Sequence, residues 1–266
     1  MPSLDPRVTE DRDFGRTAVA LGWVPAPRFL LRRAVVLDAL SRRPRGRVLE
    51  IGSGAGTLLA DLHHAGFTAE AVETSAEARE LSAVILSDLP AVRVHASLPQ
   101  GEDDRFDFLL AFEVLEHIAD DAAALRDWVR LLRPGGRVLL SVPAHANRWT
   151  ATDTWAGHVR RYDRHDLVRL AESCGIEVER CVNYGFPLSN LIEPVNAWAH
   201  AWALKRSASR DDRSAESGVR RTMETRLFPL MTFLPGRLAM RAAIGVQGWF
   251  GNTEWGNGFV LEGIKL

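Results

Sequence analysis

Residues 48–56 read VLEIGSGAG, an apolar run with one acid that leads into a glycine at every second position, Gly52, Gly54 and Gly56. Glycines here allow a tight turn from strand to helix and let the backbone approach a bound nucleoside, where a Cβ would clash. A G-x-G-x-x-G dinucleotide turn requires its third glycine one residue later, where Thr57 stands. The spacing therefore argues against a dinucleotide, and an ordinary strand-to-helix turn is the alternative.

Strand-like apolar runs recur on both sides of this turn, with helical segments between most of them. Such alternation is typical of a parallel sheet covered by helices on both faces. Arg133-Pro134-Gly135-Gly136 indicates the end of a helix and a turn before the next strand. We therefore predict an α/β fold with a doubly wound, mostly parallel seven-stranded sheet. The predicted strands are 47–51, 69–73, 91–95, 106–112, 137–142, 176–183 and 258–265, and the predicted helices are 27–41, 57–65, 76–87, 120–132 and 164–173.

The alternation breaks after Phe186, where a long segment precedes the last strand. Apolar helical pieces near 188–206 and 224–250 flank a charged, serine-rich stretch at 205–221, which we expect to be a mobile loop. The predicted organisation is an N-terminal helical segment (1–45), a core (46–185), a helical insertion that caps the core (186–256) and a final core strand (257–266).

The composition of the 266 residues is that of an ordinary globular chain, with 46% hydrophobic and 25% charged residues and a net charge of -1. This balance gives no bulk attraction to nucleic acid, and no basic stripe with interleaved aromatic residues stands out. Cys174 and Cys181 are the only cysteines, which excludes a disulfide framework and suits a reducing compartment. Without a signal-like start or a long apolar window, we expect a cytoplasmic protein with no transmembrane segment and no nucleic-acid partner.

A second feature of a nucleoside site follows the next predicted strand. Glu73 ends AEAVE, at the distance from the glycine turn where an acid accepts hydrogen bonds from ribose hydroxyls. The alternative for an acid at a strand end is a solvent-facing side chain. Thr74 and Ser75 follow as natural helix caps.

Two further motifs complete a pattern that runs from about residue 25 to residue 185. RFDFLLAFEVLEHI spans 105–118, and LLRPGG spans 131–136. Taken in order with the glycine turn and Glu73, they resemble the class I S-adenosylmethionine (SAM)-dependent methyltransferases, in the broad group with a VLEHI segment. The resemblance implies a Rossmann-like fold and SAM as the cofactor.

The resemblance also implies which residues meet SAM. Related enzymes often carry an acid that binds the adenine amino group after the third strand, but Ala96 and Ser97 stand there, and a backbone amide or the Ser97 hydroxyl would substitute. Arg28, Arg32 or Arg33 would meet the cofactor carboxylate, or else be solvated. The implied cofactor contacts are Glu50, Gly52, Ser53, Gly54 and Gly56 for the methionine and ribose, Glu73 with Thr74 for the ribose, and Phe112, Glu113 and Val114 beside the sulfonium.

Methyl transfer from a sulfonium is an in-line displacement, in which holding the reactants together supplies roughly 7–11 kcal/mol of the barrier. A hydroxyl acceptor also needs a base, because an alkoxide or phenolate attacks far better. His158 is the preferred base, narrowly ahead of His145, and His117 is the third candidate.

The EVLEH motif carries a second hypothesis. If a helix begins there, Glu113, Glu116 and His117 fall on one face. They match the metal ligands of ubiquinone-pathway O-methyltransferases and of small-RNA 3′-terminal 2′-O-methyltransferases, with His145 as a fourth ligand. A bound Mg²⁺ or Zn²⁺ would lower the pKa of an acceptor hydroxyl. The alternative is that no metal binds and the histidine caps or packs.

Residues 145–163 follow the fifth strand on the expected active-site side of the sheet. Trp149, Arg160, Arg161 and Tyr162 are the candidate substrate-binding residues, suited to an anionic or hydroxyl-bearing acceptor. The alternative is structural, with Arg161 bridging a carboxylate and Tyr162 packing.

The insertion is dense in aromatic residues and starts at the edge where the reactive methyl is expected. We expect it to lie over the pocket as a lid on an apolar or aromatic acceptor. Core packing, a homodimer surface and peripheral contact with a membrane are the alternatives. The aromatic residues are Trp198, Trp202, Phe228, Phe233, Trp249, Phe250 and Trp255.

These features together predict a methyltransferase that transfers a methyl group to oxygen of a small lipophilic or aromatic metabolite. The alternatives are a metal-assisted O-methyltransferase of a quinone precursor or an RNA 3′ end, and a SAM-binding protein without transfer activity. Fold class does not choose between oxygen, nitrogen and carbon as the methylated atom.

Overall fold

The computed structural model describes residues 3–99, 101, 103–205 and 222–266. The loop that the sequence predicts to be mobile therefore lies outside the described residues, except for Lys205 at its start.

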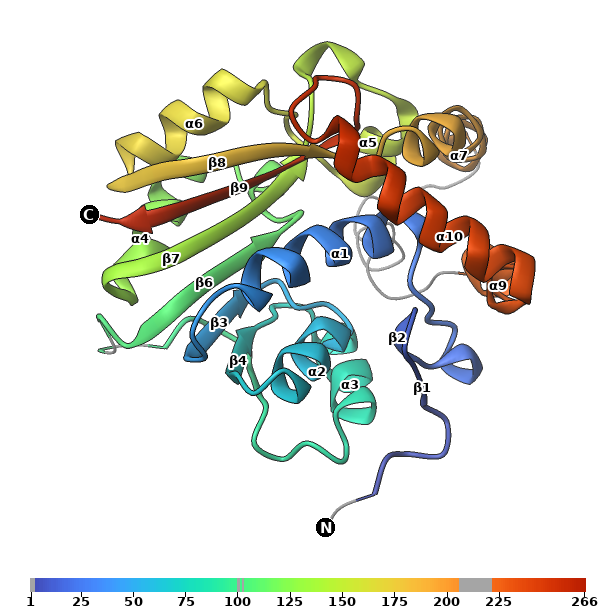
Figure 1. The fold of residues 1–266 in the computed structure, drawn as a ribbon, viewed down its shortest axis with the longest axis horizontal. Coiled ribbons are helices and arrows are strands. Elements are labelled where there is room, and N and C mark those ends of the chain that lie inside the picture. Colours follow the sequence, from blue (N-terminus) through green and yellow to red (C-terminus); the bar gives the residue numbers. More distant parts are fainter. Residues whose placement is uncertain (1–2, 100, 102, 206–221) are drawn as a thin grey trace.

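Seven strands form one sheet in the order β5-β4-β3-β6-β7-β9-β8 (Figure 1). β9 is antiparallel to both of its neighbours, whereas the other pairs are parallel. The predicted fold class is confirmed, and the strand ends lie close to the predicted ones. The strands are β3 Arg47–Ile51, β4 Thr68–Val72, β5 Arg93–His95, β6 Phe106–Phe112, β7 Leu132–Pro143, β8 Ile176–Tyr184 and β9 Gly258–Lys265.

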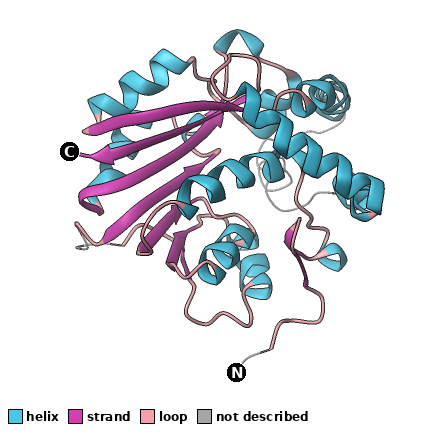
Figure 2. Cartoon of the chain, viewed as in Figure 1, coloured by secondary structure: helices cyan, strands magenta, loops and turns pink. Residues whose placement is uncertain are grey.

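Helices cover both faces of the sheet (Figure 2). Along β6 the side chains alternate, so that Phe108 and Leu110 pack into one apolar layer while Leu109 and Ala111 pack into the other. This double burial explains why the strands read as nearly continuous apolar runs. The first layer is closed by α1 Pro27–Ser41, α2 Thr57–His64 and α3 Ala76–Ile85, and the second by α4 Asp121–Arg130 and α6 Arg164–Ser173.

The strand order reverses between β3 and β6, because the chain builds outward through β4 and β5 before it returns to β6 beside β3. Ligands of doubly wound folds bind at such a point, outside the carboxyl ends of the strands. The glycine turn follows β3, and the EVLEH motif follows β6. The topology thus brings the two motifs together.

The predicted turn at Arg133–Gly136 is a bulge inside a strand. β7 begins at Leu132, which pairs with Phe106, while the next registered pair joins Phe108 to Arg137. The extra residues on β7 bulge out of the ladder, and Gly135 takes a positive φ of 71° there. Pairing of Leu132 with β6 therefore extends the strand beyond the segment that its apolar run predicts.

The N-terminal segment forms a small hairpin that the sequence did not reveal. β1 Thr9–Asp11 pairs with β2 Gly15–Thr17, and a single helical turn, η1 Val19–Leu21, follows. Arg16 is 1% exposed and donates to the Asp88 carboxylate and the Ile85 carbonyl, which fixes the hairpin on the end of α3.

The segment before the last strand is helical, as predicted. It consists of α7 Leu188–Leu204, α9 Thr222–Thr232, α10 Leu234–Gln247 and the turn η4 Gly248–Phe250. α7 packs on α5 Ala151–Ala156, and α10 packs on α1 and α9, beside the carboxyl ends of the parallel strands (Figure 1, right). The predicted single piece at 224–250 is divided at Phe233. Within the described ranges, no helix is both long and apolar enough to cross a bilayer.

Candidate functional site

A cleft of about 1210 Å³ opens at the carboxyl ends of β3, β4 and β6. Its walls come from the turns after these strands, from the start of α1, from α4 and from the loop that carries His158. Every residue of the glycine turn from 52 to 55 lines it, and so do the residues at the ends of β4 and β5.

Gly52 and Gly54 are needed in the turn for different structural reasons. Gly52 has a φ of +73°, and a Cβ there would lie 2.5 Å from the Val114 side chain. Gly54 has a φ of +54°, and a Cβ there would meet no atom within 4 Å. Gly52 is thus needed to pack two turns together, whereas Gly54 exposes its backbone to the open cleft, as close approach of a ligand requires.

Glu73 holds the glycine turn against the end of β4. Its carboxylate accepts one hydrogen bond from the Gly54 amide and one from the Ser75 amide, each at 2.8 Å. Glu73 also lines the cleft, so the side chain predicted to meet the ribose lies beside the glycines as the prediction requires.

Two buried oxygens in the cleft wall have no protein partner. They are Oε2 of Glu50 and the hydroxyl of Ser53. Burial raises the pKa of Glu50 to about 8, against the opposing effect of the Arg32 charge. Because unpaired buried polar atoms are costly, these two oxygens suit the charged amino-acid end of SAM.

The cleft wall directly after β5 carries no acid at positions 96 and 97. Ala96 and Ser97 line it together with Thr74 and Leu98. The two residues implied for adenine contact therefore line the cleft, and Asp127 of α4 lines it as well.

The three arginines considered for the cofactor carboxylate have different surroundings. Arg33 donates to both oxygens of Asp61 at 2.6 Å, on the outer side of α1. Arg28 donates to Glu113 at 2.8 Å. Arg32 lines the cleft and lies 3.7 Å from Glu113. Of the three, Arg32 is the one placed to meet a ligand.

Glu113 is held ionised in a polar cluster. Besides Arg28, the Ser141 hydroxyl donates to it at 3.0 Å and the Tyr184 hydroxyl at 3.1 Å. Burial opposes its ionisation, but Arg28 and Arg32 outweigh burial and lower its pKa to about 2. Its backbone has a φ of +58°, which turns the following residues in a new direction.

This turn contradicts the predicted helical face of EVLEH. Leu115–His117 is a 3-10 turn, η2, and Glu113 precedes it. Glu116 is fully buried, and neither of its carboxylate oxygens has a hydrogen-bond partner. Burial, followed by the negative charge of Glu113, raises the pKa of Glu116 well above its usual range.

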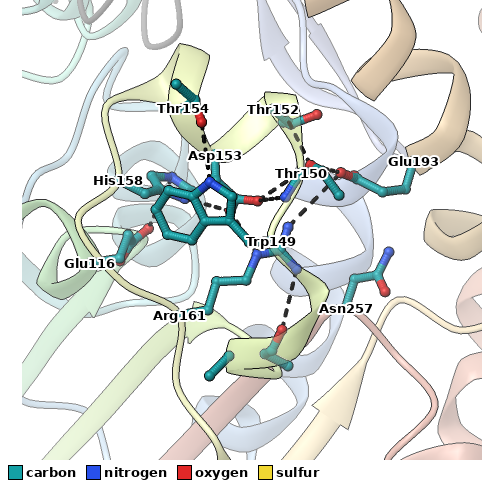
Figure 3. Close-up of polar contacts among 12 residues, drawn as sticks. Glu116, Trp149, Thr150, Thr152, Asp153, Thr154, His158, Arg161, Glu193 and Asn257 are labelled. Carbon is teal, nitrogen blue, oxygen red and sulfur yellow. Dashed lines mark hydrogen bonds and ion pairs between the residues drawn. The ribbon is translucent and has the colours of Figure 1, made fainter. Parts of the chain in front are cut away.

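His158 lies opposite Glu116, and its position is fixed by a buried carboxylate (Figure 3). Its Nδ1 lies 2.9 Å from Oδ1 of Asp153, and its Nε2 lies 3.8 Å from Glu116. Arg161 donates to the same Asp153 oxygen at 2.7 Å. Burial opposes ionisation of Asp153, yet His158 and Arg161 lower its pKa far below the usual range. An ionised Asp153 keeps the proton of His158 on Nδ1 and leaves Nε2 as an acceptor.

His117 completes a compact group. Its Nε2 is 4.0 Å from Glu116, and its ring centroid is 4.9 Å from that of His158. One ligand atom from each of Glu116, His117 and His158 lies within 4.8 Å of the others. The predicted metal ligands were Glu113, Glu116, His117 and His145. The structure keeps Glu116 and His117 together but places His158 beside them, without Glu113 and His145. Both histidines line the cleft.

His145 lies away from this group. Its ring packs on Phe259 at 5.3 Å, and its Nε2 is 3.9 Å from Glu254. Burial, followed by the charge of Arg148, lowers its pKa. It does not line the cleft as described.

The four residues predicted to bind substrate make contacts within the protein. Arg161 is buried against Asp153, and the Tyr162 hydroxyl and Arg160 both donate to Asp121 at 2.7 Å. The indole of Trp149 donates to Thr154 and is 43% exposed (Figure 3). None of the four lines the described cleft, so the structural alternative accounts for the contacts they make.

The sequence predicts that the insertion lies over the cleft as a lid. Among the described residues, the cleft lining contains none from the insertion. Trp23 and Phe29 line it instead, from the segment before α1 and from its first turn. The sequence analysis missed both, and an aromatic residue on each side of Pro27 was the signal available.

The sequence profile of a methyltransferase domain family matches residues 27–180, more than half of the chain. The chain belongs to the class I SAM-dependent methyltransferases. An uncharacterised 37.1 kDa protein of transposon TN4556 from Streptomyces fradiae is 31% identical over 201 residues, 67% of this chain and 56% of that protein. A probable SAM-dependent methyltransferase from Mycolicibacterium smegmatis is 32% identical over 158 residues, 56% of this chain and 59% of the relative.

The chain thus spans just over half the length of these two relatives. A ubiquinone biosynthesis O-methyltransferase from Alkalilimnicola ehrlichii is 27% identical over 116 residues, 42% of this chain and 47% of the relative.

Two solved structures resemble this chain in fold. The cyclase SpnF has a TM-score of 0.58 and 15% identity, covering 96% of this chain and 88% of its own. Phosphoethanolamine N-methyltransferase 2 of Haemonchus contortus, solved with SAM, has a TM-score of 0.56 and 14% identity, covering 88% of this chain and 52% of its own. At these identities the likeness shows the fold alone.

Proposed function

We propose that this chain methylates a hydroxyl group of a small, lipophilic or aromatic molecule, with His158 as the base. The observation that carries the proposal is the contact of His158 Nδ1 with Asp153 at 2.9 Å, which leaves Nε2 free to accept a proton inside the cleft. A base in this arrangement serves a hydroxyl acceptor, because oxygen must lose its proton to attack well.

SAM, when bound, supplies a methyl group on a positively charged sulfur. In this proposal Gly54 presents its backbone to the cofactor, Glu73 accepts from the ribose hydroxyls, and Glu50 binds the amino group. The raised pKa of Glu50 supports this assignment, since a cation next to a buried, unpaired carboxyl would favour its ionised form.

The acceptor would lie between the cofactor and His158. The aromatic rings of Trp23, Phe29 and Trp128 line the cleft, together with Ile118 and Leu98. Such a wall favours an apolar ring over a charged acceptor. Burial and the negative charge of Glu113 raise the pKa of Glu116 well above its usual range, which disfavours a second negative charge beside His158.

The direct test measures release of S-adenosylhomocysteine with a panel of lipophilic phenols and catechols. We expect turnover of at least one of them, and His158→Gln should lower kcat by about 10² to 10⁴. The affinity for SAM should stay within a factor of about two, because His158 serves the acceptor rather than the cofactor.

His145→Gln is the matched control, since His145 lies outside the cleft lining. We expect that variant to keep the wild-type kcat. A His158→Gln variant with unchanged kcat would remove His158 as the base. SAM binding without turnover of any oxygen, nitrogen or carbon acceptor would instead favour a binding protein.

A second candidate function is metal-assisted O-methyl transfer. The observation that favours it is the group of Glu116, His117 and His158, because both Glu116 oxygens are buried without a partner. Two imidazoles and a carboxylate are ligands that Zn²⁺ accepts. Asp153 would orient His158 by its hydrogen bond to Nδ1, the ring nitrogen that faces away from Glu116. A metal held there would lower the pKa of an acceptor hydroxyl, and His158 would then be a ligand rather than the base.

Titration with Co²⁺ distinguishes the two candidates, since its visible spectrum reports ligand binding without any turnover. The metal-assisted function predicts one equivalent bound by wild-type protein and loss of the spectrum in Glu116→Gln. Full activity after treatment with a chelator, with no cobalt spectrum, would leave His158 as the base.

A further inference from the structure

Exposed apolar side chains are concentrated on the insertion rather than spread over the molecule. Soluble monomers rarely expose so many together. Eleven large apolar residues that are more than half exposed belong to α7, α9, α10 and the segments that follow them: Leu191, Val195, Trp198, Trp202, Leu227, Leu230, Phe233, Leu234, Leu238, Trp249 and Trp255.

α7 has two apolar faces, and one of them is exposed among the residues that the structure describes. Leu191, Val195 and Trp198 recur at helical spacing and are 72%, 62% and 74% exposed. The opposite face packs on α5, where His200 stacks on Trp155 with ring centroids 4.2 Å apart. The exposed stripe is therefore not required to hold α7 on the core.

α9 and α10 repeat this arrangement. Phe228 and Met240 point inward and are buried, with Phe228 packed on Phe14 at 5.4 Å. Leu230, Phe233 and Leu234 are 69%, 68% and 65% exposed around the break between the two helices. The helices keep an inner apolar contact and present a second apolar surface to solvent.

The exposed charges of these helices have one sign. Within the described parts of α7, α9 and α10 and the caps that adjoin them, the exposed charged residues are Lys205, Arg226 and Arg241; in the segment that follows α10, the exposed acid Glu254 is paired with Arg164. The acids Glu193 and Glu224 are partly buried. Arg241 also pairs with Asp13 at 2.9 Å. A surface of aliphatic residues, Trp and cations complements an anionic bilayer, whereas a symmetric second copy would bring like charges together.

We propose that α7, α9 and α10 form a docking surface for an anionic lipid bilayer. The aliphatic and Trp side chains enter the boundary between head groups and acyl chains, and the cations contact lipid phosphates. The bound helices lie in the plane of the surface. The proposal does not depend on which acceptor is methylated.

The docking surface adjoins the segment that borders the cleft. Arg237 of α10 donates to Asp11 and Asp13 in the N-terminal hairpin, and Thr225 of α9 donates to the carbonyl of Gly22. Trp23 follows at the cleft wall. A bilayer under these helices would thus lie next to the side on which we place an apolar acceptor.

Sedimentation with lipid vesicles tests the proposal. We expect the full chain to bind vesicles of equal parts phosphatidylglycerol and phosphatidylcholine more strongly than vesicles of phosphatidylcholine alone. The double variant Leu191→Ser and Trp198→Ser should lower this binding by about tenfold or more, because each substitution removes a large apolar side chain from the lipid contact.

Leu266→Ser is the matched control, because Leu266 is 75% exposed and lies at the other end of the sheet. It should bind vesicles as the wild type does. Circular dichroism checks that each variant is folded. Absence of vesicle binding by the wild type would overturn the proposal, and so would a double variant that binds equally well. A dimer in solution that the double variant dissociates, without vesicle binding, would assign the surface to a second copy.

Discussion

Two acids of one motif, Glu113 and Glu116, have pKa values shifted in opposite directions. Arg28 and Arg32 stabilise the charge of Glu113, whereas Glu116 is buried without any hydrogen-bond partner. Environments that separate the pKa values of neighbouring carboxyls are typical of active sites. Glu113 lines the cleft, whereas Glu116 is buried behind it, 3.8 Å from His158.

Glu50 makes a pH-dependent contribution to stability. Its pKa is about 8 in the folded protein and 4.5 in an exposed carboxyl, so the folded state binds the proton more tightly. The stabilisation is present at low pH and is lost as the pH rises toward 8. Between pH 5 and pH 8, the wild type should lose roughly 3 kcal/mol of its free energy of unfolding through Glu50, and Glu50→Gln should not show this loss. Urea denaturation at the two pH values measures this.

Glu172→Gln, at an exposed site on α6, is the control and should follow the wild type. A Glu50→Gln variant whose stability keeps the wild-type pH dependence would show that Glu50 is ionised in the free protein.

Single residues were predictable where a strand fixes their position. Glu73 follows β4 directly, so its place beside the glycine turn follows from the parallel pairing of β3 and β4. Glu116 was not predictable in this way, because the positive φ of Glu113 redirects the chain, and no local pattern shows it. The pairing of His158 with Asp153 is local, five residues apart, but it depends on the short helix α5 with Gly157 as its C-cap, which the sequence analysis did not predict.

At the scale of elements, α5 and the loop after it are built around one carboxylate. Asp153 accepts from the Thr150 amide in a capping box at the start of α5, as well as from Arg161 and His158. The element that positions the base is thus held by buried charge. Its sequence, rich in Trp and Arg, has the composition of a binding loop. In the structure, however, Arg160, Arg161 and Tyr162 form hydrogen bonds to other residues of the protein.

Arg161 should therefore act on stability. Its side chain and that of Asp153 are 2% and 1% exposed. Arg161→Ala leaves the Asp153 charge with fewer partners and should lower the free energy of unfolding by about 3 kcal/mol. Denaturant titration measures the change, with Arg169→Ala on exposed α6 as the control. If Arg161→Ala instead raises KM for an acceptor without loss of stability, Arg161 contacts substrate as the sequence predicted.

The core elements were predictable because burial on both sheet faces leaves nearly continuous apolar runs between turn signals. The hairpin of β1 and β2 was not, since its strands have three residues each and its contacts, such as Arg16 with Asp88, are distant in sequence.

At the scale of the whole molecule, the N-terminal segment and the insertion form one side. Phe14 packs on Phe228, and Arg237 pairs with Asp11 and Asp13. The helical content of the insertion was predictable from its apolar spacing. Which face of each helix packs on the core was not, because a helix that is apolar on two faces does not reveal which face meets the core.

The central claim is that SAM binds between the glycine turn and Glu73. Calorimetric titration of SAM into the wild type, Glu73→Ala and the control Glu172→Ala tests it most directly. We predict binding by the wild type and the control, and an affinity about 10- to 100-fold weaker in Glu73→Ala, as expected for loss of hydrogen bonds to a charged group. Absence of binding by the wild type, or equal affinity in folded Glu73→Ala, would contradict the account.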